Sequence, residues 1–149
     1  MINFIQIDPN GLCNAGCWFC PVSIHGNPSK HKNQMPPELY ESIIKQIVEL
    51  KGELVNPRLY FVYASHYNEV LLYKHFEEML QTLQKYNLTL CLLTNGVPLT
   101  PNKIDLINKY PGVVSQIAIN AALYQRDLFE KRTGMREKLF ETLINNIYY

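Results

Sequence analysis

Three cysteines, Cys13, Cys17 and Cys20, lie close together near the start of the chain. Clustered thiolates of this kind are typical ligands of a metal centre. A [4Fe-4S] cluster held by three thiolates keeps one iron open to a further ligand, as catalytic metal sites keep a position that structural sites close. We therefore expect the chemistry of this protein to begin at an open iron beside this loop.

A zinc ion is the alternative occupant of the cysteine loop. Zinc could bind the same three thiolates together with His25 or His31. Zinc sites more often combine two close cysteines with a second close pair further along, and this sequence has one compact triplet. The pattern favours an iron–sulfur cluster, with a zinc-stabilised binding domain as the rival. Cys91 lies in an apolar run and is expected to be a buried thiol.

Composition and charge restrict the class of protein further. The chain has 149 residues, of which 47% are hydrophobic and 18% charged, so it can form one domain with a hydrophobic core. A formal net charge of +1 without a basic block does not indicate nucleic-acid or membrane binding. No apolar stretch approaches the ~20 residues of a membrane span and no signal sequence follows Met1, so we expect a cytoplasmic protein.

The elements that must position the cysteines alternate between strand and helix. Apolar runs and apolar residues at helical spacing predict about four strand–helix units. The strands are expected over residues 3–7, 59–63, 88–93 and 113–119, and the helices over 36–50, 72–86, 100–107 and 138–147. This alternation predicts an α/β fold with a parallel sheet. In such sheets the ligand site lies beyond the carboxyl ends of the strands.

Polar residues follow each predicted strand at that end of the sheet. The cysteine loop follows the first strand, Asn68 and Glu69 follow the second, residues 94–96 end the third, and Asn120 ends the fourth. The carboxyl ends of parallel strands meet at one edge. The sequence therefore predicts that these residues form one site.

The cysteine segment, with Phe19 directly before Cys20, resembles the signature of the radical S-adenosylmethionine (radical SAM) superfamily. The resemblance extends over residues 3–147 in the order that the family shows. It implies a partial (β/α) barrel with a [4Fe-4S] cluster on Cys13, Cys17 and Cys20, whose open iron is chelated by SAM. It also implies an enzyme that cleaves SAM reductively to a 5′-deoxyadenosyl radical, which then acts on a substrate that the sequence does not identify.

The family has a Gly-Gly-Glu-like motif after the second strand, whose acidic residue helps to bind the SAM amino group. The resemblance places Glu69 in that role, and a carboxylate suits an ammonium group. Here Tyr67 and Asn68 replace the glycines. Bulkier residues at these positions can move the backbone that approaches SAM.

Three further residues are implied to contact SAM. Asn120 matches the polar end of the fourth strand that contacts the ribose or methionyl part, although Ala118 replaces a residue that is often serine. Arg132 matches an Arg-x-Gly turn, and its guanidinium suits the SAM carboxylate. Phe19 is expected to offer its backbone near the adenine.

The resemblance also implies partners and an incomplete barrel. An external one-electron donor such as flavodoxin or ferredoxin is needed. Residues 1–149 are expected to form a single radical SAM core domain that is incomplete at its C-terminus, because the family core usually has six strand–helix units. The exposed edge of the last strand predicts a homodimer or a partner subunit. A non-catalytic cluster- or SAM-binding module is the alternative, because Tyr67, Asn68 and Ala118 depart from the family pattern.

Overall fold

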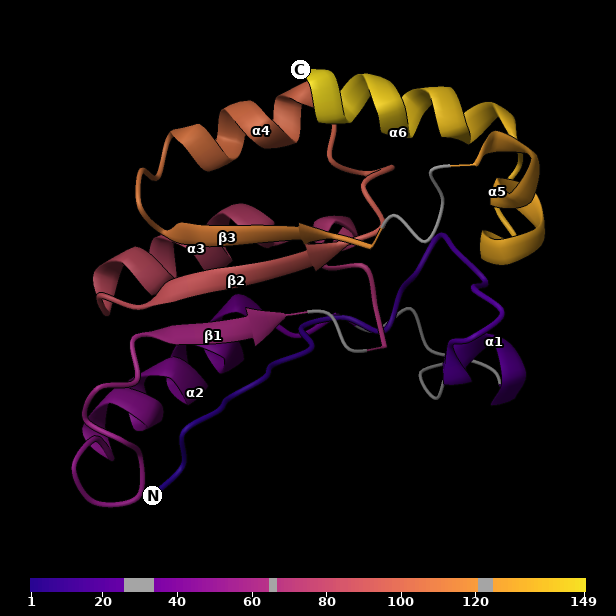
Figure 1. Cartoon of the computed structure of the whole chain (residues 1–149). Coiled ribbons are helices and arrows are strands. Elements are labelled where there is room, and N and C mark those ends of the chain that lie inside the picture. Colours follow the sequence, from indigo (N-terminus) through magenta and orange to yellow (C-terminus); the bar gives the residue numbers. More distant parts are fainter. Residues whose placement is uncertain (26–33, 65–66, 121–124) are drawn as a thin grey trace.

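Three parallel strands form the sheet in the structure, a computed structural model that describes residues 1–25, 34–64, 67–120 and 125–149 (Figure 1). The strands β1 (Phe61–Ala64), β2 (Thr89–Thr94) and β3 (Val114–Ile119) lie in the order β1-β2-β3. β2 is buried along most of its length, as its continuous apolar sequence predicts. The parallel sheet confirms the predicted α/β class.

The first predicted strand, residues 3–7, is not a regular strand of the sheet. It runs parallel to β1 and joins it through one bridge, between Gln6 and Tyr63. The amide of Ile7 donates to the Tyr63 carbonyl at 3.0 Å, and the Tyr63 amide donates to Ile5 at 3.0 Å. Pro9, which has no N–H group, follows at once and limits the pairing. The segment nevertheless carries the cysteine loop to the carboxyl end of β1.

Helices α2 (Pro37–Glu49), α3 (Phe76–Lys85) and α4 (Pro101–Asn108) connect the strands as predicted. The predicted helix over 72–86 is divided, however, because a short 3-10 helix, η1 (Val70–Leu72), precedes α3. Tertiary hydrogen bonds separate the two: the Tyr73 hydroxyl donates to the Met35 carbonyl at 2.7 Å, and the Lys74 amide donates to the Gln34 side chain at 2.6 Å.

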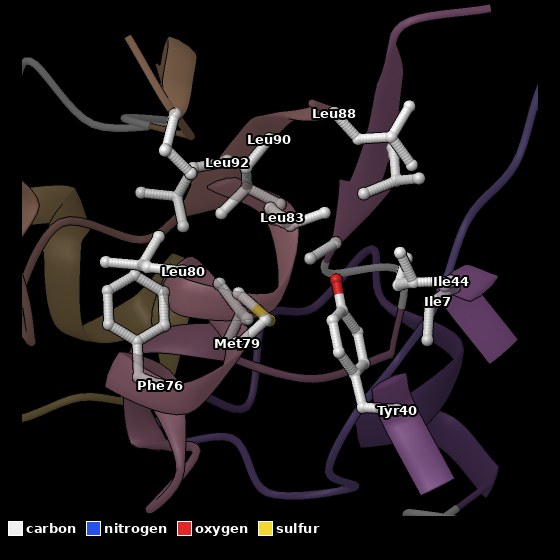
Figure 2. Packing of buried hydrophobic residues seen from close by; sticks show 14 of the residues in the cluster. Ile7, Tyr40, Ile44, Phe76, Met79, Leu80, Leu83, Leu88, Leu90 and Leu92 are labelled. Carbon is white, nitrogen blue, oxygen red and sulfur yellow. The ribbon is translucent and has the colours of Figure 1, made fainter. Parts of the chain in front are cut away.

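The main hydrophobic core lies between the sheet and the helices α2 and α3. Figure 2 shows Tyr40 of α2 beside Met79 of α3, with Ile44 of α2 on one side and Leu80 of α3 on the other, below leucines that include Leu90 of β2. All five side chains are buried. This packing fixes where each strand ends, and so fixes the edge at which the predicted site residues lie.

Two further helices follow β3: α5 (Arg126–Thr133) lies beyond the arrowheads of the sheet, and α6 (Lys138–Tyr148) runs back from α5 so that its C-terminal end lies near α4 (Figure 1). The sequence predicts α6 well, whereas it indicated only a turn near α5. The apolar face of α5 is narrow, with Phe129 and Thr133 as its buried residues, which explains the weak helical pattern. Phe129 packs with Leu143 of α6 and Val97 in a second, smaller core.

In the described ranges, no helix has the length and apolar character required to cross a membrane.

Candidate functional site

The three cysteines line a cavity of about 190 Å³ at the carboxyl end of the sheet. The same cavity is lined by Phe19, Asn68, Glu69 and Asn120, and by Ala15, Leu93, Thr94 and Asn95. The residues come from the loop before α1 (Pro21–His25), the loop after β1, and the ends of β2 and β3. The fold therefore brings together six of the seven predicted site residues, which the sequence places up to 107 positions apart, from Cys13 to Asn120.

The cysteine loop is held from two sides. On one side, the Gly16 amide donates to the Thr133 carbonyl at 2.6 Å, and the Trp18 amide donates to the Arg132 carbonyl at 3.1 Å, both at the end of α5. On the other side, the Asn95 side chain donates to the Asn14 side chain at 2.8 Å. These bonds fix the loop between α5 and the end of β2, as the path of the loop beside α5 in Figure 1 indicates.

Cys13, Cys17 and Cys20 are free thiols, as is Cys91. The surrounding chain desolvates Cys13 and Cys17 and so raises the pKa of both thiols, and the negative charge of neighbouring thiolates raises each pKa further. A bound metal centre opposes this effect, because its positive charge stabilises the thiolates and releases their protons.

A zinc ion would need a fourth ligand beside the cysteines. Of the two predicted histidines, His25 ends the short helix α1, and His31 lies outside the described residues. Among the residues with a described position, no group of three or more His, Cys, Asp or Glu side chains is arranged to hold a single metal ion.

Glu69 is almost completely buried in the wall of the cavity, with 1% of its surface exposed. Burial raises the pKa of its carboxyl group, although hydrogen bonds oppose this shift. One carboxylate oxygen accepts from the Asn95 amide at 2.8 Å, and the other accepts from the Leu71 amide at 3.3 Å. The Glu69 side chain thus holds the end of β2 against the loop after β1, besides lining the cavity.

The backbone of Glu69 connects it to the cysteine loop. Its amide donates to the Leu12 carbonyl at 2.7 Å, directly before Cys13. Its carbonyl accepts from the buried Asn10 side chain at 3.3 Å, and the Asn10 side-chain oxygen accepts from the Leu12 amide at 2.7 Å. Glu69 and the cysteine loop therefore form one hydrogen-bonded unit.

Asn68 is the residue that replaces a family glycine and that also reaches the cavity. Both polar atoms of its side chain are buried, and neither has a hydrogen-bond partner among the described residues. A buried amide without a partner is unusual in a folded protein and points to a ligand. Together with three thiols in the same cavity, it fits the iron–sulfur cluster and the polar SAM molecule that the resemblance implies.

The other predicted SAM residues lie in different settings. Asn120 is exposed at the end of β3, and its amide donates to the Thr94 carbonyl at 2.8 Å. Phe19 is partly exposed and packs edge-to-face against Trp18, with 5.9 Å between ring centroids. Arg132 does not line the cavity; its backbone carbonyl binds the cysteine loop, and its role toward SAM stays a prediction.

Sequence reasoning missed the residues that hold the loop. Gly134 adopts a left-handed conformation with φ of 65°, and a Cβ there would lie 3.3 Å from the Gly16 carbonyl oxygen. Asn14 and Asn95 were not expected to bind each other across the site. A glycine ending a helix was the one available signal, whereas the pairing of two asparagines 81 positions apart leaves no local pattern.

The sequence profile of the radical SAM superfamily matches residues 7–149. A relative from Niallia circulans, the S-adenosyl-L-methionine-dependent 2-deoxy-scyllo-inosamine dehydrogenase, is 26% identical over 111 residues. The match covers 73% of this chain and 41% of that protein. The chain thus spans less than half the length of this curated relative.

Solved structures share the fold. BtrN in complex with AdoMet and 2-DOIA has a TM-score of 0.66 and 22% identity, covering 80% of this chain and 45% of that chain. TYW1 with a lysine-pyruvate adduct has a TM-score of 0.67 and 24% identity, and the match covers 97% of this chain and 50% of the TYW1 chain. SuiB of Streptococcus suis bound to S-adenosylmethionine has a TM-score of 0.71 and 16% identity, and the match covers 96% of this chain and 31% of the SuiB chain. With the cysteine loop, the parallel sheet and the matching profile, this chain belongs to the radical SAM superfamily.

Proposed function

We propose that this protein binds a [4Fe-4S] cluster through Cys13, Cys17 and Cys20 and cleaves S-adenosylmethionine reductively. The observation that carries the proposal is that the three thiols share one cavity with Asn68, Glu69 and Asn120. When bound, the reduced cluster supplies one electron that breaks the sulfonium C5′–S bond of SAM, giving methionine and a 5′-deoxyadenosyl radical. The radical then takes a hydrogen atom from a substrate.

The residues of the chain bind and orient SAM in this proposal. Glu69 places negative charge beside the SAM ammonium group, and its hydrogen bonds to Leu71 and Asn95 keep that charge in a fixed position. Asn120 offers an exposed amide to the hydroxyl groups of the ribose. Phe19 lines the cavity, and its backbone is proposed to pair with the adenine edge. Arg132 is proposed for the SAM carboxylate.

Two partners and a location follow from the same proposal. A one-electron donor such as flavodoxin or ferredoxin reduces the cluster, because each reductive cleavage of SAM consumes one electron. A second copy of the chain or another subunit covers β3, which has a strand neighbour on one side within the described residues. A cytoplasmic location fits the clustered free thiols, which reducing conditions preserve.

The test is the formation of 5′-deoxyadenosine. The chain is loaded anaerobically with iron and sulfide, incubated with SAM and dithionite, and analysed by mass spectrometry. The wild type and Cys91→Ala are expected to form 5′-deoxyadenosine, whereas Cys17→Ala is expected to form none, because it loses a cluster ligand. A fully loaded wild type that binds SAM and forms no 5′-deoxyadenosine would contradict catalysis and favour a binding module. Bound metal without acid-labile sulfide would instead favour zinc.

A further inference from the structure

The unpartnered amide of Asn68 distinguishes it from the buried asparagines elsewhere in the chain. Asn10 donates to the Glu69 carbonyl at 3.3 Å and accepts from the Leu12 amide at 2.7 Å. Asn146 donates to the Gly96 and Val97 carbonyls at 3.0 and 2.9 Å. Asn68 as a whole is partly exposed, but both polar atoms of its side chain are buried and have no such partner in the described part of the chain. The fold thus satisfies its other buried amides and leaves this one to bind something else.

The position of Asn68 indicates what that ligand is. Its side chain lies in the wall of the cavity that Cys13, Cys17 and Cys20 also line. The carboxylate of its neighbour Glu69 already accepts hydrogen bonds from the Asn95 and Leu71 amides, so part of its hydrogen-bonding capacity is used inside the protein. Among the described residues that line the cavity, Asn68 has a side-chain amide that is buried and has no hydrogen-bond partner.

We propose that the side chain of Asn68 binds the amino-acid end of S-adenosylmethionine. This inference rests on the proposed function, in which that end of SAM lies against the open iron of the cluster. A carboxamide offers one acceptor and one donor group, and the amino-acid end of SAM carries an ammonium and a carboxylate in adjacent positions. The Asn68 oxygen accepts from the ammonium, and its amide nitrogen donates to the carboxylate.

The contact would depend on a residue that departs from the family pattern. The family pattern has glycine at this position, and glycine has no side chain with which to bind SAM. Asn68 therefore adds a polar contact to SAM beside Glu69, whose carboxylate already accepts two hydrogen bonds from the protein backbone. Because each buried polar atom gains a partner only when the ligand is bound, Asn68 favours the bound state at the expense of the free state.

The test compares Asn68→Leu, which keeps the size of the side chain but removes its polar atoms, with the wild type. Both cluster-loaded proteins are titrated with SAM and with 5′-deoxy-5′-methylthioadenosine, which lacks the amino-acid end. The Kd for SAM is expected to rise about tenfold in Asn68→Leu, whereas the Kd for methylthioadenosine changes by less than about twofold. The urea midpoint of Asn68→Leu is expected to stay at or above that of the wild type, because an unpartnered amide is removed.

Asn146→Leu is the matched control, because Asn146 is a buried asparagine with satisfied hydrogen bonds. Its urea midpoint is expected to fall. A midpoint of Asn68→Leu that falls in the same way, or an unchanged Kd for SAM, would overturn the inference. An equal rise in the Kd values for SAM and for methylthioadenosine would also overturn the inference. A cluster-loaded wild type that does not bind SAM would instead overturn the proposed function itself, and with it the inference.

Discussion

The carboxyl group of the single residue Glu69 has two structural roles. It lines the cavity, and it also accepts hydrogen bonds from the backbone amides of Leu71 in η1 and of Asn95 in the turn after β2. A buried carboxylate is retained only where its charge is compensated by hydrogen bonds or by a ligand. In the proposed function, Glu69 therefore connects the stability of the site to the binding of the SAM ammonium group.

Replacing Glu69 is expected to destabilise the protein even without a ligand. Glu69→Ala leaves the amides of Leu71 and Asn95 without partners, which costs about 2–4 kcal/mol in the free energy of unfolding. Glu69→Gln keeps one acceptor oxygen, so its free energy of unfolding is expected to fall by roughly half as much. Urea unfolding measures both.

The control for Glu69 is Glu49→Ala, because Glu49 is exposed and pairs with Lys45 at 3.6 Å. Its free energy of unfolding should change by less than about 0.5 kcal/mol. A Glu69→Ala variant as stable as this control would show that the two amides do not depend on the carboxylate.

The cysteines make a second prediction at the residue scale. Cys13→Ala, Cys17→Ala and Cys20→Ala are each expected to bind less than about a tenth of the wild-type iron and sulfide after anaerobic loading, since each removes one cluster ligand. Cys91→Ala is the control, because Cys91 lies in β2, where its sulfur is 3.7 Å from the Ser115 hydroxyl. Normal cluster content in any one of the three variants would exclude that cysteine as a ligand.

At the scale of the elements, α5 acts as a support for the cysteine loop. The Thr133 and Arg132 carbonyls at its end accept the Gly16 and Trp18 amides, and Gly134 then turns the chain in a left-handed conformation. The close approach of Gly134 to Gly16 leaves no room for a side chain without movement of the loop. The position of the cysteine loop thus depends on α5, which begins at Arg126, 110 positions after Gly16 in the sequence.

A comparison of two glycines tests this support. Gly134→Ala and Gly112→Ala both place alanine at positive φ, of 65° and 80°, and each should lose about 1–2 kcal/mol of stability. A Cβ at Gly112 meets no atom within 4 Å, whereas a Cβ at Gly134 meets the Gly16 backbone at 3.3 Å. Gly134→Ala alone is therefore expected to lose its cluster faster under chelator, by roughly threefold or more, because only there does the loop move. Equal rates of cluster loss would show that α5 does not position the loop.

The same elements show how far the sequence predicts the fold. The apolar run that forms β2 and the helical spacing in α2 and α6 are strong local patterns, and the structure follows them. The break between η1 and α3 is set by hydrogen bonds to Met35 and Gln34, which lie far away in the sequence. Such tertiary contacts override local propensity and leave no periodic signal.

The candidate site follows a similar division. The cysteines, Glu69 and Asn120 could be placed at one edge, because every strand end in a parallel sheet points there. The unsatisfied Asn68 amide and the pairing of Asn14 with Asn95 could not be foreseen, since they depend on which side chains are buried after folding. Topology thus explains why the predicted residues lie at one edge, whereas the contacts that the sequence did not indicate depend on packing.

At the scale of the whole molecule, the sheet has one edge that lacks a strand neighbour among the described residues. β1 is joined to the segment before the cysteine loop through the Gln6–Tyr63 bridge, whereas β3 pairs with β2 alone. Ile117 of β3 is 40% exposed. An apolar strand edge of this kind tends to pair with another chain.

Association through β3 is expected to appear in light scattering. The wild-type mass should approach about twice the 17.3 kDa of the chain at micromolar concentration. Ile117→Lys should shift the mass toward that of the monomer, because a charge on the edge opposes pairing. Ile147→Lys is the control, since Ile147 is similarly exposed, at 44%, but lies on α6. A wild type that stays at 17.3 kDa at every concentration would contradict self-association.

The central claim is that three thiolates hold a cluster whose remaining iron binds SAM. The most direct measurement is the electron paramagnetic resonance spectrum of the reduced, cluster-loaded chain with and without SAM. We expect about four irons and four sulfides per chain and a [4Fe-4S]⁺ signal whose g values shift when SAM is added. A loaded and reduced cluster whose spectrum stays unchanged at saturating SAM would contradict this claim.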